Sequence, residues 1–165
     1  MTERTTESVA AHFVEEARAF LRDEYLPKIE RCLDVLDEGD VWWRADATSN
    51  SVGNLLLHLD GSTRTWVLGV AGGRPVTRDR EGEFAERGPV PKAVLLDRLQ
   101  ATLAEVDAVL AGLDVAELLE RRHSPWEDVT VLWAVLHAVE HFAMHTGQII
   151  LLTKLRTRRE LRLST

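Results

Sequence analysis

Residues 130–155 read TVLWAVLHAVEHFAMHTGQIILLTKL and form a helical pattern that is apolar on most sides. One face is centred on Val131, Val135, Ala138, Phe142 and Ile149. Trp133, Met144 and Leu151 lie on another face. A helix that is apolar nearly all round is buried on most sides, either by its own bundle or by a second subunit. We therefore predict a helix bundle, and a homodimer that covers the remaining apolar face.

Three further segments repeat their apolar residues at helical spacing: residues 7–36, 50–71 and 92–110, each to within a few positions. Pro27 is expected to kink or split the first of these helices. Asn50 and Ser51 are both suitable N-caps for the second helix, which ends before Gly72. Residues 113–122 are a candidate for an additional short helix, and no segment shows a convincing strand pattern.

The segment between the second and third helices, residues 72–91, has the composition of a loop. It contains Gly72, Gly73, Pro75, Gly82, Gly88, Pro89 and Pro91 among charged residues. Such a connection is too long for a tight turn between antiparallel helices and long enough to return along the bundle. The sequence therefore predicts an all-α fold, a four-helix bundle in up-down-down-up order, with residues 1–165 forming one domain.

Composition and charge exclude several classes of protein. The 165 residues are 45% hydrophobic and 28% charged, which suits a globular domain. The net charge of -7 disfavours binding to nucleic acid or to anionic lipid. Cys32 is the only cysteine, so neither an intramolecular disulfide nor a thiolate zinc cluster can form. Because no apolar stretch has the length of a membrane span and the N-terminus lacks the apolar segment of a secretory signal, we expect a cytoplasmic protein.

The spacing of histidines in the fourth helix suggests a metal site. His141 and His145 are one turn apart on the same face, close enough to share a cation. A third imidazole from another helix would leave one coordination position open, as in catalytic rather than structural zinc sites. Gln148 lies one turn beyond His145, within reach of a hydrogen bond to a ligand. The alternative for His141 and His145 is a pair of hydrogen-bonded core histidines.

The other histidines are not assigned by periodicity alone. His137 lies farther from the apolar face of its helix, which suits a surface position or a hydrogen bond to a ligand. His58 lies at the edge of the apolar stripe of the second helix, where a partly exposed flanking histidine is the alternative to a ligand. We expect His12 and His123 to face solvent without a functional role.

Two segments of the chain resemble the DinB-like superfamily. Residues 50–58 read NSVGNLLLH, and residues 136–149 read LHAVEHFAMHTGQI. The second segment is similar to the E-H-x-x-x-H-x-G-Q-I ending of a branch of small bacterial proteins in this superfamily. Trp66, together with Trp42 and Trp43 at the end of the first helical region, extends the resemblance over nearly the whole chain.

The resemblance implies a four-helix bundle whose second helix supplies one metal-binding histidine and whose last helix supplies two. Position by position, these are His58, His141 and His145. Members of the superfamily bind zinc, nickel, manganese or iron, so the implied cofactor is a divalent metal ion, with zinc or nickel favoured. Related enzymes transfer low-molecular-weight thiols or isomerise maleylpyruvate with mycothiol, and the family name implies no contact with DNA.

A divalent ion held by three neutral imidazoles can lower the pKa of bound water toward 7 or deprotonate a coordinated thiol. We therefore expect a metal-dependent enzyme acting on a small molecule, thiol S-transferase-like ahead of hydrolase-like. The alternatives are a metal-binding stress or sensor protein without turnover, and a bundle whose relic site acts only in protein association. The sequence identifies no general base, although Arg64, Arg74 or Arg78 could reach the triad. Metal affinity is expected to fall as the pH drops through about 6.5, because protonated histidine does not coordinate.

Overall fold

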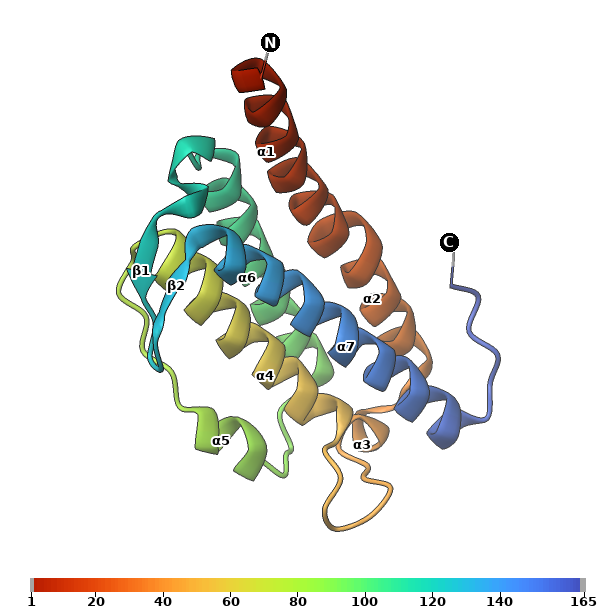
Figure 1. Cartoon of the computed structure of the whole chain (residues 1–165). Helices are drawn as coiled ribbons and strands as arrows, with labels where there is room; N and C mark the ends of the chain where they lie inside the picture. Colours follow the sequence, from red (N-terminus) through yellow and green to blue (C-terminus); the bar gives the residue numbers. More distant parts are fainter. Residues whose placement is uncertain (1, 164–165) are drawn as a thin grey trace.

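The computed structural model describes residues 2–163 of the chain, with the backbone alone for residues 2–6 and 8. Most of these residues are helical, which confirms the predicted all-α class (Figure 1). Within the described residues, the long helical units are α1 (Thr2–Ala19) continued by η1 (Phe20–Tyr25) and α2 (Leu26–Val35), α4 (Val52–Thr63) continued by η2 (Arg64–Ala71), α6 (Lys92–Ala111), and α7 (Val131–Thr157). A short helix, α3 (Glu38–Val41), follows the first unit.

The first helical unit passes Pro27 without a break. Proline lacks the N–H of a regular helical hydrogen bond and its ring crowds the preceding turn, so a regular α-helix does not continue through it unchanged. Here η1 is π-helical and places Pro27 in the first turn of α2. The wider turns of η1 thus accommodate the proline that the sequence analysis expected to kink or split this helix.

Side-chain pairs define how the helices run relative to one another. The Asp60 carboxylate accepts hydrogen bonds from Arg98 and Thr102, and Arg64, one turn later, donates to Thr102 and Glu105. Since both sets of partners advance along the chain together, α4 with η2 runs in the same direction as α6. The first unit and α7 run the opposite way, as Figure 1 shows. The four units enclose a core with fully buried Ile29, Leu55, Leu59, Leu99, Phe142 and Ile149.

The connection of residues 72–91 is not entirely a loop, contrary to the prediction. It contains a helix, α5 (Arg80–Ala85), which lies beside α4 (Figure 1). The Asp79 carboxylate caps α5 by accepting a hydrogen bond from the backbone N–H of Gly82 at 2.9 Å. An N-cap of this kind satisfies one of the donors that a helix start leaves free, and it allows a helix in glycine-rich sequence.

A small β-hairpin precedes α7 and was not predicted. After the short helix η3 (Val115–Leu119), which lies within the predicted 113–122, β1 (Arg121–His123) pairs antiparallel with β2 (Asp128–Thr130). The turn between the strands is closed by Ser124, whose Oγ donates to the carbonyl of Glu127 and accepts from the N–H groups of Trp126 and Glu127. The hairpin therefore holds Trp126 in a defined position, although its side chain is 62% exposed.

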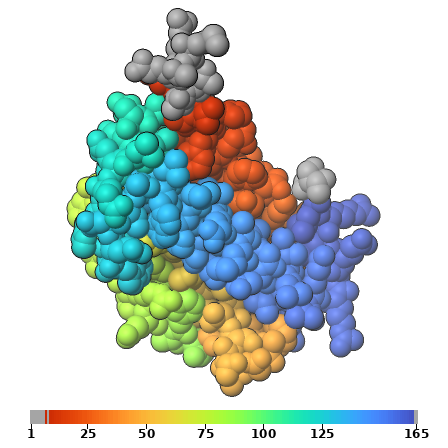
Figure 2. Space-filling view, in the orientation of Figure 1, coloured from red at the N-terminus to blue at the C-terminus, as the bar shows by residue number. Residues whose placement is uncertain are grey.

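Part of the apolar face predicted for α7 is exposed to solvent. α7 crosses the middle of the face shown in Figure 2. Trp133, Met144 and Leu151 are 40%, 51% and 57% exposed.

Among the helices of the described residues, none combines the length and the apolar character needed to span a membrane.

Candidate metal centre

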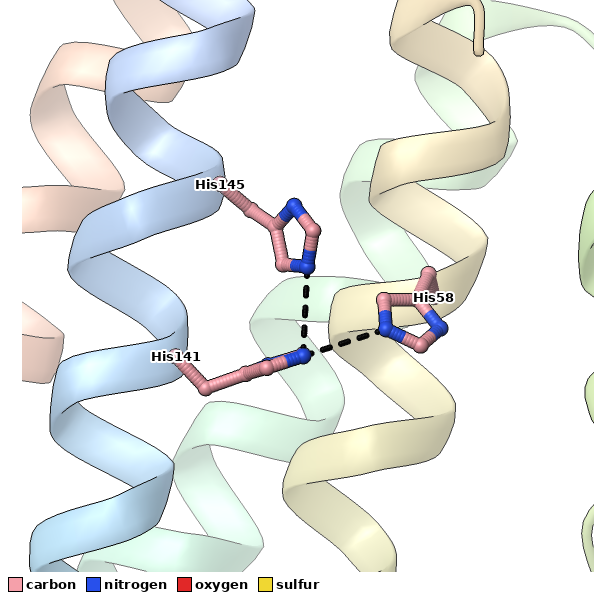
Figure 3. A group of neighbouring side chains, drawn as sticks. All are labelled: His58, His141 and His145. Atoms are coloured by element: carbon pink, nitrogen blue, oxygen red, sulfur yellow. Dashed lines mark hydrogen bonds between the residues drawn. The ribbon is translucent and has the colours of Figure 1, made fainter. Parts of the chain in front are cut away.

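Three imidazoles from two helices converge on one point (Figure 3). His58 projects from α4, and His141 and His145 project from α7. The Nε2 atom of His141 lies 3.1 Å from the Nε2 of His58 and 3.1 Å from the Nε2 of His145. The structure thus assembles the three histidines that the resemblance selected, and it buries His58, which periodicity alone had placed at an edge.

Acceptor oxygens beside the two buried histidines favour protons on their Nδ1 atoms. The Nδ1 of His58 lies 2.9 Å from a carboxylate oxygen of Glu83, and the Nδ1 of His145 lies 2.8 Å from the side-chain oxygen of Gln148. Because both oxygens accept hydrogen bonds, each Nδ1 donates a proton. Each Nε2 then presents its lone pair to the centre, as a metal ligand must. Gln148 occupies the position expected from its spacing.

The arrangement of the Nε2 atoms suits a single small cation. Two nitrogens that share a tetrahedral ion at 2.0–2.1 Å are separated by about 3.3 Å, close to the distance between neighbouring Nε2 atoms here. The Nε2 of His141 can carry at most one proton, and it faces two lone pairs. At most one of these contacts can therefore be a well-aligned hydrogen bond, whereas a cation between the rings would be bound by all three lone pairs.

Glu83 is the site residue that the sequence analysis missed. It lies on α5, is only 9% exposed, and accepts hydrogen bonds from the Nε and Nη2 of Arg78 at 2.6 and 2.8 Å. Arg78 also approaches the Nδ1 of His58 to 3.0 Å. Of the three arginines considered from sequence, Arg78 is therefore the one at the site, whereas Arg64 and Arg74 pair with a carboxylate on α6.

The start of α4 holds Glu83 in place. The side-chain amide of Asn54 donates to the backbone carbonyls of Glu83 and Glu86 at 2.8 and 3.0 Å. Asn54 and Ser51 also form a reciprocal capping box at the start of α4. Farther along α4, Gly61 leaves the space that the Glu83 carboxylate fills, since a Cβ there would overlap it. The hydrogen bonds from Asn54 and the absence of a side chain at Gly61 together position the Glu83 carboxylate.

His137 lies outside the triad and stacks on Trp133, with ring centroids 4.8 Å apart and planes at 6°. Its centroid is also 4.8 Å from that of Trp66 and 5.5 Å from that of His141. His12 and His123 are exposed, as expected, and pair with nearby carboxylates. His137 thus joins the triad to a group of tryptophans and does not serve as a fourth converging nitrogen.

The model of the mycothiol S-transferase family matches residues 9–156. The chain belongs to this family. Two solved structures share its fold, each 16% identical to it with a TM-score of 0.66. A DinB-like protein from Bacillus subtilis aligns over 88% of this chain and 95% of its own, and a conserved protein from Enterococcus faecalis aligns over 92% and 97%. Among curated proteins, no sequence matches. The resemblance to the DinB-like superfamily is confirmed.

The electrostatics of this mycothiol S-transferase family site keep the imidazoles of His141 and His145 neutral. Burial, assisted by the neighbouring imidazoles, lowers the pKa of His141 to about 3, and burial also lowers the pKa of His145. Burial alone would raise the pKa of the Glu83 carboxyl, but the hydrogen bonds from Arg78 and His58 together hold it below its ordinary value. Protons should therefore compete with a metal ion for His141 and His145 well below the pH of about 6.5 expected from sequence.

Replacing Glu83 tests its part in orienting His58. The substitution Glu83→Gln keeps the shape of the side chain but removes its charge and one acceptor for Arg78. We expect metal affinity to fall roughly tenfold to a hundredfold, the range typical when a hydrogen-bond partner of a metal ligand is lost. Competition with a chromophoric chelator measures the affinity. Glu81→Gln, on the exposed side of the same helix, is the matched control, and equal affinity for the two variants would contradict this role.

Proposed function

We propose that this chain is a divalent-metal-dependent thiol S-transferase in which His58, His141 and His145 hold the ion. The observation that carries the proposal is the convergence of three Nε2 atoms in a member of the mycothiol S-transferase family. A bound zinc or nickel ion would supply a Lewis acid that lowers the pKa of a thiol reaching it. The expected substrate is accordingly a low-molecular-weight thiol.

The residues of the chain prepare the site for this chemistry. Neutral imidazoles leave the charge of the cation uncompensated, and Glu83 and Gln148 keep the protons of His58 and His145 on the Nδ1 atoms. A cavity beside the triad gives a small molecule access to His58 and His141. A thiol whose pKa has fallen toward neutrality can release its proton to water, so the reaction does not depend on a dedicated general base.

The proposal is tested by metal analysis combined with a thiol-transfer assay. Protein purified without chelator should contain bound divalent metal and should couple mycothiol to an electrophile, and chelation should abolish the turnover. Readdition of zinc or nickel should restore it. Stoichiometric metal without turnover of any thiol would instead identify a metal-binding stress or sensor protein. Absence of metal would leave a bundle with a relic site.

We also propose that α7 mediates a homodimer. Met144 and Leu151 share one exposed apolar face of this helix, and such a face is commonly covered by an identical subunit. Sedimentation at micromolar concentration should show a dimer, which Met144→Glu should weaken by more than about tenfold because it buries a charge. Val94→Glu, at an exposed apolar position on α6, is the control. A monomer for the unaltered protein at this concentration would refute the dimer.

A further inference from the structure

A cavity with an aromatic wall adjoins the triad. Its volume is about 340 Å³, and His58 and His141 line one part of it. Trp66, Trp126 and Trp133 line another part. This volume lies in the range of small-molecule sites and suffices for one substituted ring. Any molecule in the cavity would therefore contact both the histidines and the tryptophans.

The aromatic rings form a continuous series from the triad to the surface. His137 is next to His141 and stacks on Trp133. Trp133 meets Trp66 edge-on at 5.1 Å between centroids, and Trp66 stacks with Trp126 at 5.4 Å and 24°. Stacked and edge-on contacts of this kind are the favoured arrangements of aromatic rings. A planar ligand ring can extend the same series.

The outer rings of this wall pack against other rings while still exposed. Trp66 is only 5% exposed, whereas Trp133 is 40% and Trp126 62% exposed. The backbone of Trp126 is held by the turn that buried Ser124 closes with its hydroxyl, and its ring stacks on Trp66. Aromatic surface that is already ordered binds a partner with little further loss of conformational entropy.

The charges around the cavity favour an uncharged ligand. Arg80 and Glu127, which both line it, carry opposite charges, and Arg78 is engaged with Glu83. Away from the triad, the lining thus offers ring faces and no strong net charge, which suits an uncharged ring.

We propose that this cavity binds the electrophilic partner of the transfer, an uncharged planar aromatic molecule carrying a leaving group. The inference rests on the proposed thiol transfer. The ring stacks on Trp126 and Trp133 with its reactive carbon toward His141. The thiol gives its proton to water, its sulfur forms a bond to the ring carbon, and a halide departs with the electron pair of its own bond. Proton and halide balance the reaction, and no oxidant or reductant is required.

The binding step can be measured with a ring that cannot react. We would titrate 1,3-dinitrobenzene, which has no leaving group, into metal-loaded and chelated protein by calorimetry. Trp126→Ala, at a largely exposed position, should weaken binding about tenfold, the loss expected for one aromatic contact. Trp126→Phe should retain most of the affinity. Trp43→Ala is the control, because Trp43 does not line the cavity and lies against Arg156.

The outcomes separate this inference from the proposed function. Binding should survive chelation, because stacking needs no ion, and the saturated analogue 1,3-dinitrocyclohexane should bind at least about tenfold more weakly. If dinitrobenzene binds but thiol transfer is absent, the proposed function fails and the aromatic site stands. Equal affinity for the Trp126→Ala and Trp43→Ala variants would overturn the inference. So would a dimer that Trp126→Ala dissociates, combined with no dinitrobenzene binding, because a second copy would then cover the wall.

Discussion

His141→Ala should reduce bound metal from about one ion per chain to less than about a tenth of that, because its Nε2 is the one adjacent to both other ligand nitrogens. Removing a ligand should lower the metal affinity more than removing a ligand's hydrogen-bond partner, which typically lowers it roughly tenfold to hundredfold. Metal is quantified after gel filtration in metal-free buffer. Circular dichroism of the same samples reports whether the helices remain folded.

Matched histidine variants make this result specific. His58→Ala and His145→Ala should lose metal in the same way, since each removes one of the converging nitrogens. His123→Ala should keep full occupancy, because that side chain is 83% exposed and lies on β1, apart from the triad. Full occupancy in all three triad variants would show that the imidazoles do not hold the ion.

The second large effect concerns pH and the stability of metal-free protein. The pKa of His141 is lowered to about 3 in the folded state, compared with about 6.5 in the unfolded chain. Between these values the unfolded chain binds a proton that the folded protein does not, so acid favours unfolding. The free energy of unfolding should be highest above pH 6.5 and should decrease toward pH 3, by at most about 1.4 kcal/mol per pH unit for this group.

Urea denaturation at several pH values within this window measures the slope. The lowered pKa values of His145 and His137 act in the same direction as that of His141. The variant His141→Gln lacks one titrating group and should show a shallower decline of the free energy of unfolding as the pH falls. Identical slopes for the variant and the unaltered protein would contradict the assignment of a depressed pKa to His141.

The long helices and the His141–His145 pair could be predicted because both depend on short-range spacing. Apolar residues that recur at helical intervals bury themselves by forming helices, and two residues one turn apart share a face in any helix. The burial of His58 could not be predicted in this way, because helical periodicity places it at the edge of the apolar stripe of its helix. It is buried because residues far along the chain cover it: the Phe84 ring lies 4.6 Å from its ring, and Glu83 binds its Nδ1.

The helix α5 and the strands β1 and β2, which the sequence did not predict, depend on tertiary contacts. α5 contains Gly82 and lies among prolines and glycines, so its local propensity is that of a loop. It is helical in a setting where Asp79 caps it and the amide of Asn54 holds its end. The strands β1 and β2 have three residues each, too few for alternation to be recognised in a sequence.

The side chain of Asn54 links two helices, α4 and α5, that are distant in sequence. It completes the cap at the start of α4 and, through the same amide group, holds the backbone of α5. If α5 swings away from the bundle, the first turn of α4 loses a neighbour that orders its cap, and that turn becomes freer to fray. Hydrogen exchange at the first amides of α4 would then record each opening of a segment about thirty residues away. The connection and the helix that carries His58 would move as one cooperative unit.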